Sequence, residues 1–190
     1  MRATEVLQDE HRVVERVLET LEKVTDRLQA GKTVSTEVME DSVDFLNNFV
    51  DRHQHAKEES ILFPAVKAAG GVEERLLVDE MMAEHEESRR YLGALSLSVK
   101  GYRQGDEAAE ATLIESARSY IALLRRHIGK EEQILFPMVG SLLSDVHRNE
   151  LTARFERLES ERIGAGVHER YHQMVETLSR SVRSLKHPEA

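Results

Sequence analysis

The chain contains one eleven-residue pattern twice. Residues 54–64 read QHAKEESILFP, and residues 127–137 read HIGKEEQILFP. Each copy follows a Glu-His pair, Glu10-His11 or Glu84-His85, at a similar distance. Histidine and glutamate side chains are costly to bury without a partner. A duplicated segment that carries both into an apolar run therefore points to a buried metal site built from two copies of one unit.

The spacing of apolar residues predicts helices throughout. In the first thirty residues they recur every three or four positions, which is the helical period: Val6, Leu7, Val13, Val14, Val17, Leu18, Leu21, Val24 and Leu28. Ten glycines and three prolines leave little material for the turns of a β-sandwich. We expect an all-α fold in which Gly31 ends the first helix, and in which Pro64 and Pro137 end the helices that carry the repeat.

The two copies predict an up-down four-helix bundle. His11 lies about 21 residues before the first turn and position 54 about 22 after it, so a rise of about 1.5 Å per residue brings them to one height on antiparallel helices. His85 and His127 are placed likewise around the turn at 104–106. Such bundles commonly hold metals in a layer of inward side chains. We expect residues 1–144 to form the bundle and residues 145–190 an extension of one or two helices packed on it within the same domain.

Composition excludes several classes of function. A formal charge of −9 argues against nucleic-acid binding, because a protein that binds nucleic acid needs a basic face. The chain has no cysteine, so iron–sulfur clusters and thiolate zinc sites are excluded. The amino terminus lacks the apolar stretch of a secretory signal, and no run of about 18 apolar residues suggests a membrane partner. We expect a cytoplasmic protein, and the sequence indicates no protein partner.

The repeated pattern supplies ligands for two ions. His127 and Glu131 are four residues apart and share a helix face, so the imidazole can bind one ion while the carboxylate bridges to a second. Nitrogen and oxygen ligands without sulfur suit iron, manganese or zinc, and open positions on iron admit dioxygen, peroxide or nitric oxide. One of each neighbouring glutamate pair must face away, so we interpret Glu59 and Glu132, and with them Lys57 and Lys130, as solvated charge.

These residues resemble the haemerythrin-like, or HHE cation-binding, proteins in their bacterial form. The resemblance covers most of the chain, and its segments are Glu10-His11-Arg12, 57–64, 83–86, 127–137 and the tail at 166–172. It implies a four-helix bundle around a non-haem centre of two iron ions joined by an oxo or hydroxo bridge. The ligand positions that it implies are His11, His85, His127 and Glu131, with Glu58 as the second bridging carboxylate.

The chain departs from the family's pattern at position 54. Four residues before Glu58, where the pattern has a ligand histidine, this chain has Gln54, with His53 and His55 on either side. His55 could pair with Glu59 by a shift of register, Gln54 could be a neutral oxygen donor, or one iron could have one ligand fewer. We favour His55, because a histidine–carboxylate pair four residues apart survives there, although the helix phase favours Glu58 over Glu59.

A second departure lies in the third helix. Haemerythrins that carry oxygen have two histidines four apart there, whereas this chain has His85 followed by Arg89. His168 and His172 are again four residues apart near the carboxyl end. We therefore include both as candidate ligands that replace the missing histidine.

The expected function is a di-iron protein that binds dioxygen, nitric oxide or peroxide for sensing, storage or detoxification. One alternative is an enzyme that decomposes peroxide or reduces nitric oxide at the same centre; the sequence identifies no dedicated proton donor, so turnover is left open. Another alternative is a metal-free helical interaction module in which Gln54 marks a decaying site.

Overall fold

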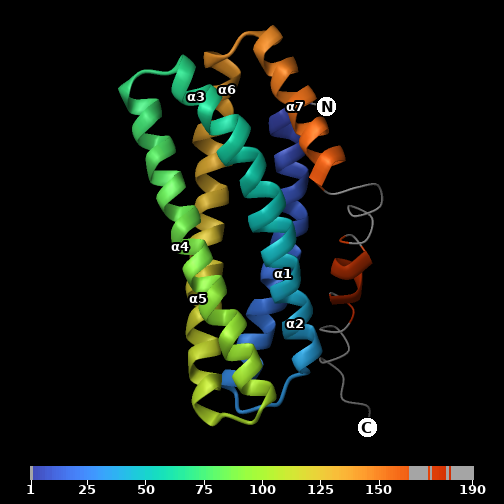
Figure 1. The fold of residues 1–190 in the computed structure, drawn as a ribbon. Coiled ribbons are helices and arrows are strands. Elements are labelled where there is room, and N and C mark those ends of the chain that lie inside the picture. The colour runs from blue at the N-terminus through green and yellow to red at the C-terminus, as the bar shows by residue number, and fades with distance from the viewer. Residues whose placement is uncertain (1, 163–170, 172, 179, 181–190) are drawn as a thin grey trace.

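The computed structural model describes residues 2–162, 171, 173–178 and 180, and this part of the chain is helical without any strand (Figure 1). The elements are α1 (Ala3–Gln29), α2 (Thr36–Phe45), η1 (Leu46–His55), η2 (Glu58–Leu62), α3 (Phe63–Ala69), α4 (Val72–Arg103), α5 (Glu107–Lys130), η3 (Glu131–Leu135), α6 (Phe136–Leu142) and α7 (Asp145–Arg162). The segments named η are π-helical.

The elements form the predicted bundle of two helical hairpins. One hairpin joins α1 to the continuous run from α2 through α3, and the other joins α4 to the run from α5 through α6 (Figure 1). Gly31 and Gly105 make the turns, with φ angles of 68° and 81°, in the left-handed region where glycine is least strained. The all-α bundle with an added carboxyl-terminal helix is therefore confirmed, while the division of the chain at residue 144 stays a prediction.

Pro64 and Pro137 do not end helices, so this expectation was wrong. Each follows a π-helical turn and sits in the first turn of the next α-helix. Proline cannot donate to the carbonyl four residues earlier, and the wider turn avoids this need because Phe63 N–H bonds back five residues to the Glu58 carbonyl. The Ser60 carbonyl, four residues before Pro64, accepts instead from Arg154 of α7 at 3.3 Å.

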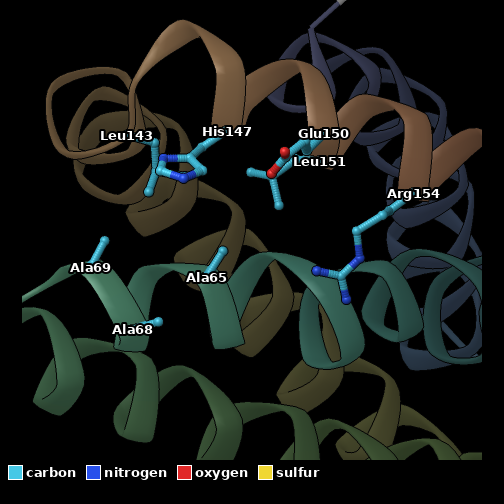
Figure 2. Close-up of a pocket in the computed structure, with 8 residues that line it drawn as sticks. All are labelled: Ala65, Ala68, Ala69, Leu143, His147, Glu150, Leu151 and Arg154. Atoms are coloured by element: carbon cyan, nitrogen blue, oxygen red, sulfur yellow. The ribbon is translucent and has the colours of Figure 1, made fainter.

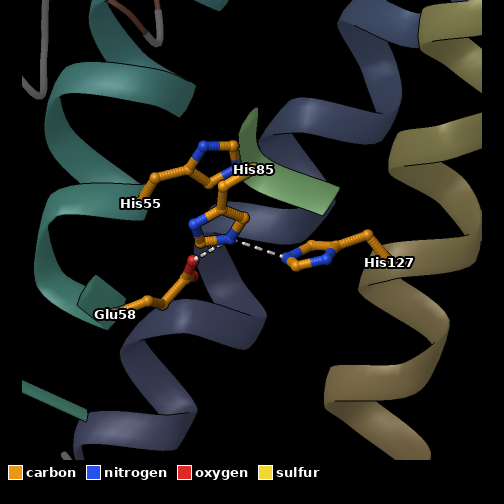
Figure 3. A group of neighbouring side chains, drawn as sticks. All are labelled: His55, Glu58, His85 and His127. Atoms are coloured by element: carbon orange, nitrogen blue, oxygen red, sulfur yellow. Dashed lines mark hydrogen bonds and ion pairs between the residues drawn. The ribbon is translucent and has the colours of Figure 1, made fainter. Parts of the chain in front are cut away.

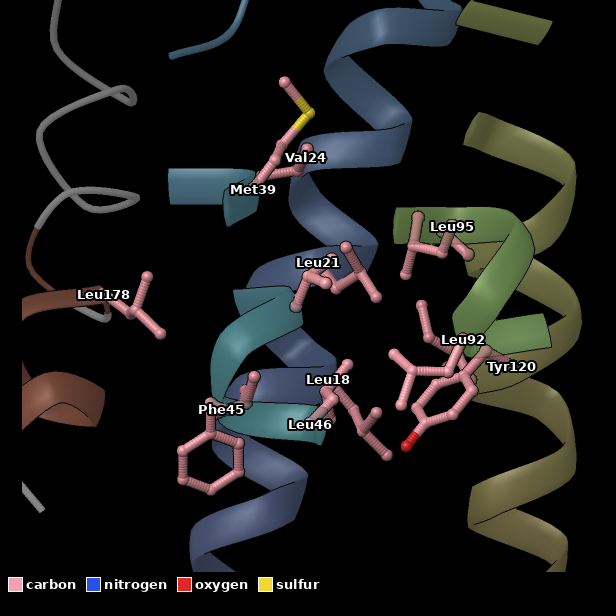
Figure 4. Close-up of a cluster of buried hydrophobic side chains, with 14 of the residues drawn as sticks. Leu18, Leu21, Val24, Met39, Phe45, Leu46, Leu92, Leu95, Tyr120 and Leu178 are labelled. Carbon is pink, nitrogen blue, oxygen red and sulfur yellow. The ribbon is translucent and has the colours of Figure 1, made fainter. Parts of the chain in front are cut away.

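The core consists of two apolar clusters with a polar layer between them. One cluster fills the half of the bundle near the two glycine turns, where Leu18, Leu21, Phe45, Leu92 and Tyr120 pack together (Figure 4). The other fills the opposite half and includes Leu7, Phe63, Met81, Leu135 and Phe155. On every helix of the bundle the buried histidines and glutamates lie between the residues of these clusters, so each face of the polar layer meets hydrocarbon.

Helix α7 covers one end of the bundle. Its Leu151 and Phe155 are buried in the second apolar cluster. Between α7 and α3 lies a pocket of about 320 Å³ (Figure 2), lined by Ala65, Ala68, Ala69, Leu143, His147, Glu150, Leu151 and Arg154. The pocket shares no residue with the polar layer. Among the helices of the described residues, none is both long and apolar enough to cross a membrane.

Candidate metal centre

The polar layer takes side chains from all four helices of the bundle. Its fully buried or nearly fully buried members are Glu10, His11, His53, Gln54, His55, Lys57, Glu58, Glu84, His85, His127 and Glu131. Both copies of the repeat contribute a buried glutamate to it: Glu58, the first residue of η2, and Glu131, the first residue of η3. The two π-helical turns therefore start at matching glutamates that face the interior.

One group of ligand atoms comes from His55, Glu58, His85 and His127, within 4.8 Å of one another. Figure 3 shows Glu58 and His127 approaching the ring of His85 from two sides. His85 Nε2 lies 3.3 Å from Glu58 Oε2 and 3.0 Å from His127 Nε2. The His55 ring stacks on the His85 ring with a centroid distance of 3.8 Å. Three imidazoles and one carboxylate thus converge on one point.

A second group adjoins the first. It consists of His11, Glu58 and Glu131, again with ligand atoms within 4.8 Å. His11 Nε2 lies 3.0 Å from Glu131 Oε2, and the other oxygen of Glu131 lies 3.7 Å from His127 Nε2. Glu58 belongs to both groups, and Glu131 reaches from His11 to His127. The two carboxylates are therefore placed to bridge two neighbouring cations.

Outer carboxylates fix the orientation of three imidazoles. Nδ1 of His11 lies 3.0 Å from Glu132 Oε1, and Nδ1 of His127 lies 3.0 Å from Glu84 Oε2. Nδ1 of His85 lies 2.7 Å from Glu59 Oε1. A carboxylate only accepts, so Nδ1 carries the proton in each neutral ring and the Nε2 lone pair faces inward. Histidine ligands of metals are commonly held in this way.

The centre concentrates polar atoms that the described residues leave unsatisfied. The oxygens of Glu58 and Glu131 and Nε2 of His11 are buried, and apart from the short ion-pair contacts of Glu58 with His85 and of Glu131 with His11 and His127 they have no hydrogen-bond partner in the described part of the chain. Buried carboxylates are costly in this state. Cations at the two groups would satisfy these atoms, so the residues fit a pair of metal ions.

Burial and neighbouring charges shift the pKa values of three histidines in the layer. Burial lowers the pKa of His11, but the hydrogen bond and charge of Glu131 outweigh it and raise that pKa to about 9. His85 behaves likewise, because Glu58 and Glu59 offset burial and raise its pKa to about 9. Burial and the neighbouring His85 lower the pKa of His55 to about 4. Protons on His11 and His85 thus balance part of the carboxylate charge that a metal would neutralise.

Comparison with known proteins identifies the family. Residues 2–139 match the family model described as the hemerythrin HHE cation binding domain. The chain belongs to this HHE family. Two proteins described as uncharacterized, Rv1995 of Mycobacterium tuberculosis and Mb2018 of Mycobacterium bovis, are each 24% identical to this HHE chain over 162 residues, which is 85% of this chain and 63% of theirs. This HHE chain thus spans less than two thirds of their length, and no solved structure matches it. Family and buried cluster together indicate metal binding.

The structure brings most of the predicted ligands of the HHE chain together. They are His11, His55, Glu58, His85, His127 and Glu131. His168 and His172 lie outside the described residues. The expected pairing of His55 with Glu59 is not found, because His55 groups with Glu58 while Glu59 bonds to His85 and Arg89.

Sequence reasoning misjudged the charged neighbours of the ligands. Glu59 and Glu132 are not merely solvated, since each binds a histidine of the other hairpin. Lys57 is completely buried, and its ammonium contacts Glu10 and lies 2.9 Å from His53 Nε2. Lys130 donates to Glu84 at 2.8 Å. Both copies share the Lys before and the Glu after the bridging glutamate, but this recurrence does not reveal the partners of these residues.

Proposed function

We propose that the chain binds two iron ions in the polar layer and that the loaded centre takes a small ligand, namely dioxygen, nitric oxide or peroxide, for sensing, storage or detoxification. His55, His85, His127 and Glu58 would hold one ion. His11, Glu131 and the shared Glu58 would hold the other. The observation that supports this most strongly is the convergence of the buried Glu58 and Glu131 carboxylates with four inward imidazoles in two adjoining groups.

The small molecule is expected to bind at the ion held by His11, Glu58 and Glu131. Only three protein groups hold that ion, and iron with so few protein ligands retains open coordination positions. Iron would supply an electrophilic site for a diatomic or peroxide ligand. Glu58 and Glu131 would neutralise the ionic charge, and Glu59, Glu84 and Glu132 would keep the histidine lone pairs directed inward. The apolar clusters on both sides would exclude bulk water while admitting a small, weakly polar molecule.

Metal analysis tests the proposal. Protein purified from iron-supplemented cells is expected to hold about two irons per chain, in line with the two ligand groups, and to absorb in the near ultraviolet as bridged di-iron centres do. His85→Ala should lower the iron content of otherwise folded protein. Iron well below one per chain after anaerobic loading, with thermal stability unchanged by chelation, would instead favour a metal-free helical module.

Ligand binding needs a separate measurement. Addition of nitric oxide or peroxide to the loaded protein should change the iron absorption bands at one ligand per centre or less. Sustained oxygen release from peroxide would identify a peroxide-decomposing enzyme, whereas a saturable spectral change without turnover supports a binding protein.

A further inference from the structure

The two ligand groups differ in chemistry. The group of His55, His85, His127 and Glu58 offers three nitrogens and one carboxylate. The group of His11, Glu58 and Glu131 offers one nitrogen and two carboxylates. We call them the histidine-rich position and the carboxylate-rich position.

Most contacts in the polar layer occur twice, once for each copy of the repeat. The difference between the two ligand groups is therefore a local departure from this symmetry. His11 meets Glu131 through Nε2 at 3.0 Å and Glu132 through Nδ1 at 3.0 Å. His85 meets the matching pair, Glu58 at 3.3 Å and Glu59 at 2.7 Å, through the same two nitrogens. A centre that followed the repeat completely would therefore have two equivalent positions.

The equivalence ends where Gln54 replaces the counterpart of His127. His127 Nδ1 bonds to Glu84 Oε2 at 3.0 Å. The matching oxygen of the first hairpin, Glu10 Oε2, is buried and has no hydrogen-bond partner among the residues that the structure describes, and the same is true of Gln54 Oε1. The first hairpin thus keeps the outer carboxylate, but position 54 brings no imidazole to its Oε2, while His53 lies 3.0 Å from the other oxygen, Oε1.

The first hairpin supplies a different imidazole, that of His55, to the histidine-rich position. His55 stacks on His85 and joins the histidine-rich group. Relative to the repeat, one nitrogen donor has moved from the carboxylate-rich position to the histidine-rich one. The first position therefore has three nitrogen donors and the second has one, while Glu58 and Glu131 lie between the two positions.

We propose that the centre fills in order and that its two positions differ in selectivity: the histidine-rich position takes a nitrogen-preferring ion such as iron(II) or zinc(II) first, and the carboxylate-rich position then takes a second iron(II) or, where manganese(II) is in excess, this oxygen-preferring ion. Imidazole suits zinc and iron, whereas carboxylate and water suit manganese. This inference rests on the proposed function only in requiring that the polar layer binds metal. Zinc(II) and iron(II) bind more tightly than manganese(II) at nitrogen-rich sites. This difference in affinity is smaller at a site with mostly oxygen ligands.

The first test uses metal-free protein and zinc alone. Calorimetric titration should resolve two binding steps, one ion per chain each. His55→Ala should weaken the first step by about 10-fold or more, since even the loss of an outer partner of a ligand costs about 10- to 100-fold. His11→Ala should leave the first step unchanged and remove the second. Two equal steps, or equal effects of both substitutions, would overturn the proposed order.

The second test supplies both metals. Protein given one equivalent of zinc and excess manganese, then desalted, should retain one of each per chain and show the electron paramagnetic resonance spectrum of a single manganese ion. Manganese pairs, or loss of all manganese, would contradict the selectivity. Failure to bind either metal would contradict the proposed function itself and is thus a distinct outcome.

Gln54→His supplies the matched gain-of-ligand variant. A histidine at position 54 restores the donor that the repeat has at His127. We expect the second zinc step to tighten by about 10-fold or more and zinc to displace manganese from the carboxylate-rich position. Unchanged zinc binding in a variant whose helix content and melting temperature match the parent would contradict the assignment of Gln54 to that position. Circular dichroism of every variant separates lost binding from lost folding.

Discussion

Glu132 binds Nδ1 of His11 at 3.0 Å across 121 residues of chain, and so joins the start of α1 to the second copy of the repeat. Glu59 and His85 make the same contact in the opposite direction at 2.7 Å. Each Glu-Glu pair thus holds the histidine of the other hairpin, one glutamate on each ring nitrogen. Neither hairpin contains a complete metal position by itself.

Replacement of Glu132 should weaken metal binding without touching a ligand. Glu132→Gln removes the negative acceptor that orients His11, so we expect affinity at the carboxylate-rich position to fall by about 10- to 100-fold. Calorimetric titration measures this. Glu115→Gln, at an exposed position of α5, is the matched control and should bind as the parent does; an equal loss in both variants would contradict the role of Glu132.

Lys57 should matter for stability more than Lys130. Lys57 is completely buried against Glu10 and His53, with the Phe155 ring 5.8 Å from its ammonium, whereas Lys130 is 20% exposed. Lys57→Met leaves the Glu10 carboxylate buried without its cation, so the free energy of unfolding of the metal-free protein should fall by about 3–5 kcal/mol.

Urea denaturation of matched variants checks this expectation. Lys130→Met should cost clearly less than Lys57→Met, because Lys130 is partly exposed and its partner Glu84 keeps the contacts with His127 and Arg126. The double variant Lys57→Met with Glu10→Gln should recover part of the loss, since no uncompensated charge then stays buried. Equal costs for the two lysines would show that burial of Lys57 does not determine its contribution.

Metal affinity should increase with pH. The pKa values of His11 and His85 are raised from 6.5 to about 9 in the metal-free protein, because Glu131 and Glu58 outweigh the effect of burial. Between these values the folded protein holds protons that a metal must displace. We expect proton release on binding and an apparent affinity that rises up to about pH 9. Calorimetry in two buffers of different ionisation enthalpy counts the protons; pH-independent affinity between 6.5 and 9 would refute the expectation.

Pro64 should maintain the geometry of Glu58. In Pro64→Ala the new N–H can donate to the Ser60 carbonyl, which permits an ordinary α-helical turn in place of η2. We expect a change in the direction of Glu58, weaker metal binding and unchanged helix content. Titration and circular dichroism measure the two quantities. Val66→Ala in the same helix is the control for a general loss of packing in α3.

The bundle and most of the ligand layer could be predicted from the sequence because they depend on spacing alone. His11, His85 and His127 lie at matching distances from two turns, and helical rise brings such positions to one level. Spacing alone does not decide which residue around position 54 faces the interior. A uniform helical period allows only one of His53, Gln54 and His55 to face inward, whereas the π-helical segment η1 buries all three.

The outer charges could not be placed for a different reason. Burial of Lys57 depends on α7, whose Phe155 and Glu159 approach its ammonium from a part of the sequence that carries no repeat. The roles of Glu59 and Glu132 depend on contacts between hairpins, which spacing within one helix does not reveal. Only the three-dimensional arrangement distinguishes these glutamates from ordinary surface charge.

The interlocking of the hairpins has a consequence for biosynthesis. His11 leaves the ribosome early, but its partners Glu131 and Glu132 follow only after more than a hundred further residues. A nascent chain therefore cannot complete the carboxylate-rich position until η3, which carries both glutamates, has been synthesised and has docked on α1. An ion bound by His11 and Glu131 would therefore have to wait for the second hairpin.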